Sequence, residues 1–473
     1  MSLALSRRVL RPLPRTLALQ SGCLHTPPSA PNTSYSAITH PENPESVPEV
    51  ISETIKRSAS VLLPVYARPP FILERGRGAY LWDTQGRKYL DFSGGIAVNA
   101  LGHADPELAD RMAEQAKTLL HTSNVYYNAW AGKLAELLVT LTQHEGGLGW
   151  QSGSTPSSPP QGAKVFFSNS GTEANEGALK IARKVGKARG GASKFRFACF
   201  ANGFHGRSMG ALSATATEKY QAPFEPLVPG FDVGKLNDLE GLERLVTKDT
   251  CGVIVEPIQG EGGIHVAGEE WLRALRLRCD QVGAVLIFDE IQCGLFRSGT
   301  MWAHSALPTE CHPDVITMAK PLANGYPIGA VLMRDSVAEC MTVGTHGTTF
   351  GGSPLACALG HHVLSRVSDR AFVASVKKHS SYLHDRLSQL PLWFPTLVED
   401  IRGRGFIQGI AFRDVKHPGK IVSMARERGV LLLTAGKDAV RIVPSLNVGV
   451  EEIDGAVDVI ESCLGLVEKE VSD

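Results

Sequence analysis

A lysine stands at the end of an apolar run, where its amine could act as a nucleophile. The run Val315–Ala319 leads directly into Lys320. Burial at the rim of an apolar site lowers the pKa of a lysine and frees its amine to attack a carbonyl. The alternative is a lysine held in an ion pair or lying along the surface. The Gly/Pro-bounded turn Gly325–Ala330 would let backbone approach a cofactor closely, so it favours the reactive amine.

A second apolar run ends in two carboxylates. Ala284–Phe288 is followed by Asp289 and Glu290. An ionised aspartate at a buried strand end needs a positively charged partner. A protonated pyridinium nitrogen would be such a partner, and Mg²⁺ would be another. Taken alone, these residues leave both partners open.

Two further segments could hold an anion and a flat ring. Lys164–Phe167 leads through Ser170, Gly171 and Thr172 into a helical pattern, and free amides at that helix start would suit a phosphate. An ordinary helix cap is the alternative there. No GxxxxGK[ST] motif occurs, which argues against a nucleotide P-loop. After Phe195–Phe200, Phe204 offers a face on which a pyridine ring could stack, and Arg207 offers a bidentate partner for a carboxylate.

The elements that must position these residues follow an alternating pattern. Short apolar runs separated by helical or loop segments are typical of parallel βαβ units with a sheet buried on both faces. These runs are Lys164–Phe167, Phe195–Phe200, Gly252–Val255, Ala284–Phe288, Val315–Met318 and Ile328–Met333. Ligands of such sheets bind beyond the carboxyl ends of the strands, where the residues above stand.

The flanking segments indicate a second, smaller α+β domain. Tyr80–Asp83 and Arg87–Phe92 read as a hairpin, and helical periodicity follows at 106–120 and 129–143. From about Pro354 the chain is helical, and strands are expected at 406–412, 430–433 and 440–443. We therefore expect a leader and linker at 1–48, with folded structure beginning near Val61. The small domain is expected to combine 49–100 with 354–473, around a large domain at 101–353 that carries a surface insertion at 146–162.

Composition narrows the classes of function. The formal net charge is zero and the longest apolar runs are strand-sized, so we expect no nucleic-acid partner and no membrane span. Nine scattered cysteines contain no CxxC pair and no zinc-like spacing, so we expect no metal site. Before Glu42 the chain has arginines but no acidic residue, and Arg7, Arg11 and Arg15 recur at helical spacing. This composition is typical of a mitochondrial transit peptide, with an unaddressed tail as the alternative.

Six motifs in order now identify a family. They are NSGTEANE, NGFHGR, EPIQGEGG, DEIQCGLFRSG, MAKPLANGYPIGA and HGTTFGGSPLA. The chain from about Tyr66 to its end resembles the class III, ornithine-aminotransferase-like, aminotransferases. The resemblance implies the type I fold of the enzymes that use pyridoxal 5′-phosphate (PLP), with a mostly parallel seven-stranded sheet in the large domain. It also implies a homodimer.

The same resemblance implies roles for individual residues. Lys320 would carry PLP as a Schiff base and move the substrate proton, and Asp289 would pair with the pyridinium nitrogen. Gln292 would lie near the cofactor's 3-hydroxyl. The full set of implied cofactor positions is Ser170, Gly171, Thr172, Phe204, Asp289, Gln292, Lys320 and Thr349.

Four further positions would contact substrate. Arg441 would bind the α-carboxylate of glutamate or 2-oxoglutarate, and Glu261 would mask that arginine when an ω-amino substrate binds. Arg207 would receive the carboxylate of the amino donor. Thr348 and Thr349 would reach across from the partner subunit, Thr349 to the phosphate. Glu256 has a less defined role.

One stretch narrows the substrate within the family. Ser93–His103 is similar to the members that act on N-acetylornithine, whereas those that act on ornithine carry a tyrosine where this chain has Gly95. The expected reaction is therefore transfer of the δ-amino group of N2-acetyl-L-ornithine to 2-oxoglutarate, in arginine biosynthesis in the mitochondrial matrix. Ornithine, succinylornithine and 4-aminobutyrate stay open as donors. A PLP racemase, aminomutase or decarboxylase and a non-catalytic PLP-binding protein are alternatives outside transamination.

Overall fold

The central sheet is buried on both of its faces, because successive side chains of its strands point alternately to one face and the other. The computed structural model describes residues 27–472, and it places seven strands in the order β4-β12-β11-β10-β7-β5-β6. Their bounds are β4 (Ala163–Ser168), β5 (Arg196–Phe200), β6 (Phe231–Gly234), β7 (Thr250–Val255), β10 (Val285–Asp289), β11 (Val315–Met318) and β12 (Gly329–Arg334). In β5, Phe197 and Cys199 pack on the α5 side, while Ala198 and Phe200 pack on the α9 side. This alternation is the period of two that a strand imposes.

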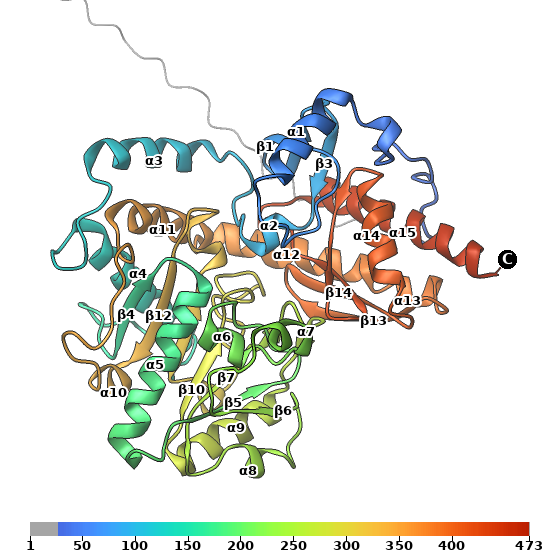
Figure 1. Cartoon of the computed structure of the whole chain (residues 1–473). Helices are drawn as coiled ribbons and strands as arrows, with labels where there is room; N and C mark the ends of the chain where they lie inside the picture. The colour runs from blue at the N-terminus through green and yellow to red at the C-terminus, as the bar shows by residue number, and fades with distance from the viewer. Residues whose placement is uncertain (1–26, 473) are drawn as a thin grey trace, which may run out of the picture.

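Helices such as α5 and α9 cover these two faces, and others belong to the second body described below. The longer ones are α1 (Glu49–Ala59), α3 (Pro106–Thr118), α4 (Ala129–Glu145), α5 (Gly171–Gly190), α9 (Glu269–Val282), α11 (Pro354–Val367), α12 (Arg370–Leu387), α14 (His417–Arg426) and α15 (Val450–Ser472). Figure 1 shows α5 lying across the large sheet, with α4 and α11 beside β4 and β12. None of the helices within 27–472 is both long and apolar enough to cross a bilayer.

Six of the seven strands run parallel, which confirms a mostly parallel sheet. The exception is β12, which is antiparallel to both β11 and β4. The run Ile328–Met333 was expected among parallel units, and that expectation was wrong in direction. The connection from Met318 to Gly329 contains only the short 3-10 helix Lys320–Ala323, which is too short for the crossover that parallel neighbours need.

A second body of the molecule is built from both ends of the chain. The hairpin strands β2 (Tyr80–Asp83) and β3 (Lys88–Asp91) lie in one sheet with β1 (Leu73–Arg77), and β3 pairs with β15 (Val430–Leu431). An antiparallel sheet of β13 (Val398–Arg404), β14 (Ile407–Phe412), β17 (Ala439–Ile442) and β16 (Leu433–Ala435) lies beside it. Figure 1 places α12, α14 and α15 on this side, away from the large sheet.

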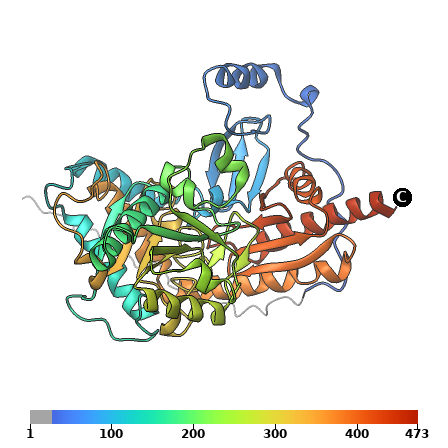
Figure 2. The same ribbon diagram turned by 60° about the horizontal axis from the view of Figure 1, so that its bottom comes forward.

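Two segments differ from their expected form. The segment expected to be a linker is docked in residues 32–42, where the Asn32 amide donates to Glu461 and Glu42 forms a bidentate ion pair with Arg426. Folded structure also begins before Val61, because α1 occupies 49–59; Figure 2 shows this helix standing out from the body. The expected transit peptide at 1–26 lies outside the described residues.

The insertion at 146–162 is only partly a surface loop. Residues 151–162 are exposed or half-buried, whereas Gly146–Leu148 are buried, with Leu148 in the main core. A glycine-rich run was read as solvated because of its composition. The buried start follows from the packing of Gly147 against the indole of Trp302, where an added Cβ would come within 2.7 Å of the ring.

Candidate active site

The carboxyl ends of three neighbouring strands bring the expected catalytic residues to one edge. Asp289 is the last residue of β10, and Lys320 follows the end of β11 after Ala319. The two strands are parallel neighbours, with Asp289 paired to Thr317. Glu256 follows β7, the strand on the other side of β10. Because β7, β10 and β11 are parallel neighbours, their carboxyl ends lie at the same edge of the sheet, and the polar residues that follow them meet there.

Asp289 is buried and surrounded by donors. Its Oδ2 accepts from Asn175 Nδ2 at 2.7 Å and from His205 Nδ1 at 2.8 Å, and its Oδ1 accepts from the Ile291 amide at 3.1 Å. Asn175 in turn accepts from the Thr317 hydroxyl. Donors on both oxygens fix the plane of the carboxylate. An aspartate held in this way can present charge to a cation at the same edge.

The neighbouring Glu290 belongs to a different network. Its side chain is fully buried and accepts from His304 Nδ1 at 2.8 Å, from the Ala303 amide and from the Cys293 thiol. It therefore turns away from Asp289. No cluster of three or more His, Cys, Asp or Glu residues that could hold a metal exists in the described part of the chain. The donor set around Asp289 suits a protonated ring nitrogen better than Mg²⁺, which prefers several oxygen ligands.

The Lys320 amine is poised to react. It has no hydrogen-bond or ion-pair partner among residues 27–472. Burial and, second, the Arg441 guanidinium lower its pKa from 10.5 to about 8, against the opposite effect of the carboxylates Glu256, Asp289 and Glu261. A neutral amine is the form that attacks a carbonyl.

The start of α5 forms an anion cradle. Ser170 is the N-cap residue, and its hydroxyl accepts from the Glu173 amide at 3.3 Å. The amides of Gly171 and Thr172 precede the first intrahelical bond and stay free to donate. The hydroxyl of Thr172 bonds that of Ser208 at 2.7 Å. Gly206, at φ 136°, allows this loop to approach, because an added Cβ would come within 2.3 Å of the Thr172 hydroxyl oxygen.

Phe204 and Glu256 are joined across the site. The Phe204 amide donates to Glu256 Oε1 at 2.8 Å, and the Gly260 amide donates to Oε2 at 2.9 Å. Burial raises the pKa of Glu256 to about 7, against the opposing charge of His205 and with the help of the Asp289 carboxylate. Glu256 thus holds the Phe204 loop in place and carries charge that varies near neutral pH.

An arginine and a glutamate form an ion pair on a further side of the site. Arg441, on β17, is 3 % exposed and donates from Nη2 to Glu261 Oε2 at 2.9 Å and from Nη1 to Gln292 Oε1 at 3.0 Å. Burial lowers the pKa of Arg441, with Glu261 as the main opposing influence. Its Nε is buried without a partner. Glu261 is the only carboxylate on this guanidinium in the described chain, and it covers the face that a substrate carboxylate would take.

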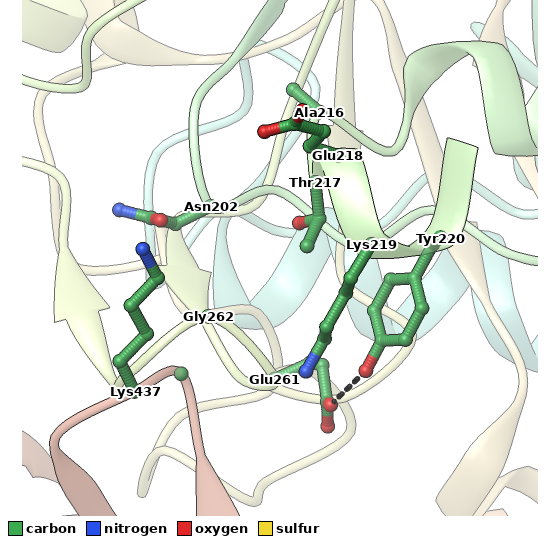
Figure 3. Close-up of a pocket in the computed structure, with 10 residues that line it drawn as sticks. Asn202, Ala216, Thr217, Glu218, Lys219, Tyr220, Glu261, Gly262 and Lys437 are labelled. Carbon is green, nitrogen blue, oxygen red and sulfur yellow. Dashed lines mark hydrogen bonds between the residues drawn. The ribbon is translucent and has the colours of Figure 1, made fainter. Parts of the chain in front are cut away.

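A cavity opens outside Glu261. Its volume is about 320 Å³, and Figure 3 shows Tyr220, Lys219, Lys437 and Asn202 on its wall, with a hydrogen bond from the Tyr220 hydroxyl to Glu261. Arg207 lies next to this wall, its guanidinium carbon 3.9 Å from the Tyr220 ring centroid and 5.4 Å from that of Phe204. Glu261, the carboxylate that covers Arg441, thus also lines this cavity.

Two of the implied residues form no hydrogen bond with Asp289, Lys320 or Arg441 within residues 27–472. Thr348 accepts from Asn169 Nδ2 at 3.0 Å, and Thr349 is exposed. Three groups that sequence reasoning left without a role join the site: Asn175 and His205 on Asp289, and Tyr220 on Glu261. His205 stands in the NGFHGR motif, so its place was signalled, whereas Tyr220 stands in no apolar or glycine-rich pattern.

The side chains at this edge fit PLP. A buried, donor-held carboxylate suits its pyridinium, an unpartnered amine suits its aldehyde, and the free amides at the start of α5 suit its phosphate. The cavity beyond leaves room for a substrate.

Comparisons with known proteins agree with this geometry. The family model described as "Aminotransferase class-III" matches residues 64–464. The chain is 48 % identical, over 427 residues, to the mitochondrial acetylornithine aminotransferase of Neurospora crassa, covering 90 % of this chain and 89 % of that protein.

Solved structures of the same kind match in fold. The ornithine aminotransferase from Toxoplasma gondii ME49 superposes with a TM-score of 0.80 at 29 % identity, covering 89 % of this chain and 96 % of that one. The N-acetylornithine aminotransferase from Stenotrophomonas maltophilia K279a has a TM-score of 0.71 at 34 % identity, covering 88 % and 100 %. Fold similarity and sequence identity therefore rank the two kinds of enzyme differently.

Proposed function

The chain belongs to the class III aminotransferases, and from that premise we propose that it transfers the δ-amino group of N2-acetyl-L-ornithine to 2-oxoglutarate. The observation that supports two alternating substrates is Arg441 masked by Glu261 at 2.9 Å. An ω-amino donor needs the mask in place, and a dicarboxylate acceptor needs it removed. A racemase or an aminomutase has less need of such a pair.

Each protein group has a task in the proposed reaction. PLP, when bound, supplies the electron sink that stabilises negative charge on the substrate carbon. Lys320 would attach the cofactor and would move a proton at that carbon through its Nζ. Asp289, fixed by Asn175 and His205, would keep a proton on the ring nitrogen. Ser170, Gly171 and Thr172 would hold the phosphate, and Phe204 would offer its face to the ring.

The substrate contacts are proposed from the same geometry. Arg207, which is exposed and lies over the Tyr220 ring, takes the carboxylate of the donor, while Glu261 keeps Arg441 covered. Arg441 takes the α-carboxylate of 2-oxoglutarate or glutamate after Glu261 turns away. Gln292, which accepts from Arg441, keeps its amide nitrogen free to donate toward the 3-hydroxyl of the cofactor.

Substitution of Lys320 by Ala tests the chemistry. We expect turnover to fall below detection while the circular dichroism spectrum and thermal midpoint stay close to wild type, because the amine has no partner whose loss would disturb the fold. An active Lys320→Ala protein would remove Lys320 from the proposal.

A comparison of kcat/KM across four donors tests the substrate. N-acetylornithine, succinylornithine, ornithine and 4-aminobutyrate should be assayed against 2-oxoglutarate. We expect N-acetylornithine to be preferred over ornithine by at least tenfold. The TM-score of 0.80 to the Toxoplasma gondii enzyme keeps ornithine as the second candidate, and a preference for it would support that candidate instead.

We also propose a homodimer with shared active sites. Tyr127 and Val343 are fully exposed apolar residues, at 107 % and 106 % of their reference areas. They belong to two segments, 119–127 and 343–350, that touch where the His121 and Phe350 rings lie 5.4 Å apart. Thr349 lies in the second segment, so a partner seated here would receive Thr349 at its own phosphate site, and Thr348 at the substrate.

Light scattering after size exclusion tests the dimer. Val343→Asp should yield a monomer that binds PLP more weakly, because it would lose the partner's Thr349. Leu392→Asp is the matched control, since Leu392 is exposed on α13 (Leu390–Trp393) on the far side of the small domain. If Val343→Asp stays dimeric, the contact lies elsewhere.

We propose that the chain divides into a leader and linker at 1–48, a small domain formed by 49–100 and 354–473, and a large domain at 101–353. The proposed location of the protein is the mitochondrial matrix. The name of the Neurospora crassa relative includes "mitochondrial", and an arginine-rich segment without acidic residues precedes Glu42 in the sequence. A fluorescent fusion of residues 1–48 should enter mitochondria, and the same fusion with Arg7, Arg11 and Arg15 changed to Gln should not.

A further inference from the structure

Tyr220 lies between three groups of the site. Its hydroxyl donates to Glu261 Oε1 at 3.0 Å. One face of its ring carries the Arg207 guanidinium at 3.9 Å from the centroid, and its edge meets the Phe204 ring, with centroids 6.0 Å apart and planes at 80°. Figure 3 shows the hydroxyl pointing from the wall of the cavity to the Glu261 carboxylate. The ring is thus held on two sides and its hydroxyl has a fixed direction.

Glu261 is held at both of its oxygens. Oε2 meets Arg441 Nη2 at 2.9 Å, and Oε1 accepts from Tyr220. The Glu261 side chain is 31 % exposed, against 3 % for Arg441, so it stands between the buried guanidinium and the open cavity. Rotation into the cavity would break the bond to Arg441, and the Tyr220 bond opposes that rotation. The masked position is therefore stabilised by a residue that forms its hydrogen bond with Glu261 and none with Arg441.

We propose that Tyr220 is a positioning residue that sets the balance between the masked and open states of Arg441, and through it the choice between an ω-amino donor and a dicarboxylate. This inference rests on the proposed function for the identity of the two substrates. A group that stabilises one of two states shifts their populations by its differential interaction with them. Tyr220 is seen to stabilise the masked state, so its loss favours the open one.

Tyr220→Phe tests this directly because it removes only the hydroxyl. The readout is the dissociation constant of glutarate, an unreactive dicarboxylate, measured by titration calorimetry on the PLP-loaded enzyme. Loss of one hydrogen bond to a partly exposed carboxylate is expected to tighten glutarate binding about three- to tenfold. N-acetylnorvaline, which keeps the donor's carboxylate and lacks its amine, should bind within about twofold of wild type, since it needs no unmasking.

A second variant tests whether the Tyr220 hydroxyl acts through Glu261. Glu261→Gln weakens the attraction to Arg441 and should tighten glutarate binding more than Tyr220→Phe does. In the Glu261→Gln background, adding Tyr220→Phe should change glutarate affinity by less than about twofold. Non-additivity of this kind is the mark of residues that act through each other.

Three outcomes would overturn the inference. Glutarate affinity that is unchanged or weaker in Tyr220→Phe, equal tightening of both ligands, or a full Tyr220→Phe effect without Glu261 would each do so. The first and third of these use glutarate alone and do not depend on which amine is the donor. If the wild-type enzyme preferred ornithine, the proposed substrate would fail while the glutarate measurements would still decide the role of Tyr220.

Discussion

The pKa of Lys320 is the property of the site that can be tested most directly. Burial and the Arg441 guanidinium lower it from 10.5 to about 8. At pH 7.5, a pKa of about 8 leaves about a quarter of the amine neutral, against about 0.1 % at the ordinary value of 10.5, a gain of about 200-fold. Since the neutral amine is the nucleophile, the cofactor-free protein should react at Lys320 far faster than a free lysine does at neutral pH.

Competitive labelling measures this without turnover. The cofactor-free protein would receive a trace of isotopic acetic anhydride at pH values from 6 to 11, with Nα-acetyl-lysine amide as internal standard. Mass spectrometry of the Lys320 peptide then gives its labelling rate, scaled to its own plateau at high pH. The sign follows from the lowered pKa: protons leave as pH rises, so the rate should climb with a midpoint near pH 8.

Arg441→Gln is the informative variant. Removing the guanidinium takes away the second cause of the lowered pKa and leaves the opposing carboxylates in place, so the midpoint should move upward. A wild-type midpoint above about pH 9.5, or no upward movement in Arg441→Gln, would refute this reading of the site.

Three other predictions concern stability and specificity. Arg297 is fully buried, has no carboxylate partner among residues 27–472, and donates to the carbonyls of Ala97, Phe406 and Pro444. Arg297→Met should therefore lower the free energy of unfolding in urea by about 2–4 kcal/mol, whereas Arg75→Met, at an exposed arginine, should lower it by under about 1 kcal/mol. Glu42→Gln should cost about 1 kcal/mol and increase proteolysis of residues 27–47, because the ion pair to Arg426 holds that segment; undiminished protease resistance would contradict this. Gly95 has φ +62°, so Gly95→Ala should lower the free energy of unfolding by about 1 kcal/mol from backbone strain alone. Gly95→Tyr should in addition lower kcat/KM for N-acetylornithine at least tenfold and leave that for ornithine nearly unchanged. Equal losses for both donors would show that Gly95 does not set specificity.

Local patterns were enough to place most of the large sheet. Five apolar runs agree with β4, β5, β7, β10 and β11 to within two residues, and the hairpin strands agree equally well. β6 was missed because Phe231–Gly234 is a half-exposed edge strand without an apolar run. The same cause explains the strands that were found and the strand that was missed. A strand that is buried on both faces needs a continuous run of apolar residues, whereas an exposed edge strand does not.

The sequence by itself therefore determined the family, the strands and the polar residues at their ends, because each depends on neighbours within a few positions. Tertiary structure alone decided the reversed direction of β12, the pairing of β3 with β15, and the docking of residues 32–42 on α14 and α15. It also decided that Tyr220, from the short helix α7 (Glu218–Gln221), meets Glu261. Such contacts join residues far apart in the chain, and their energy depends on how the whole core closes rather than on any local pattern.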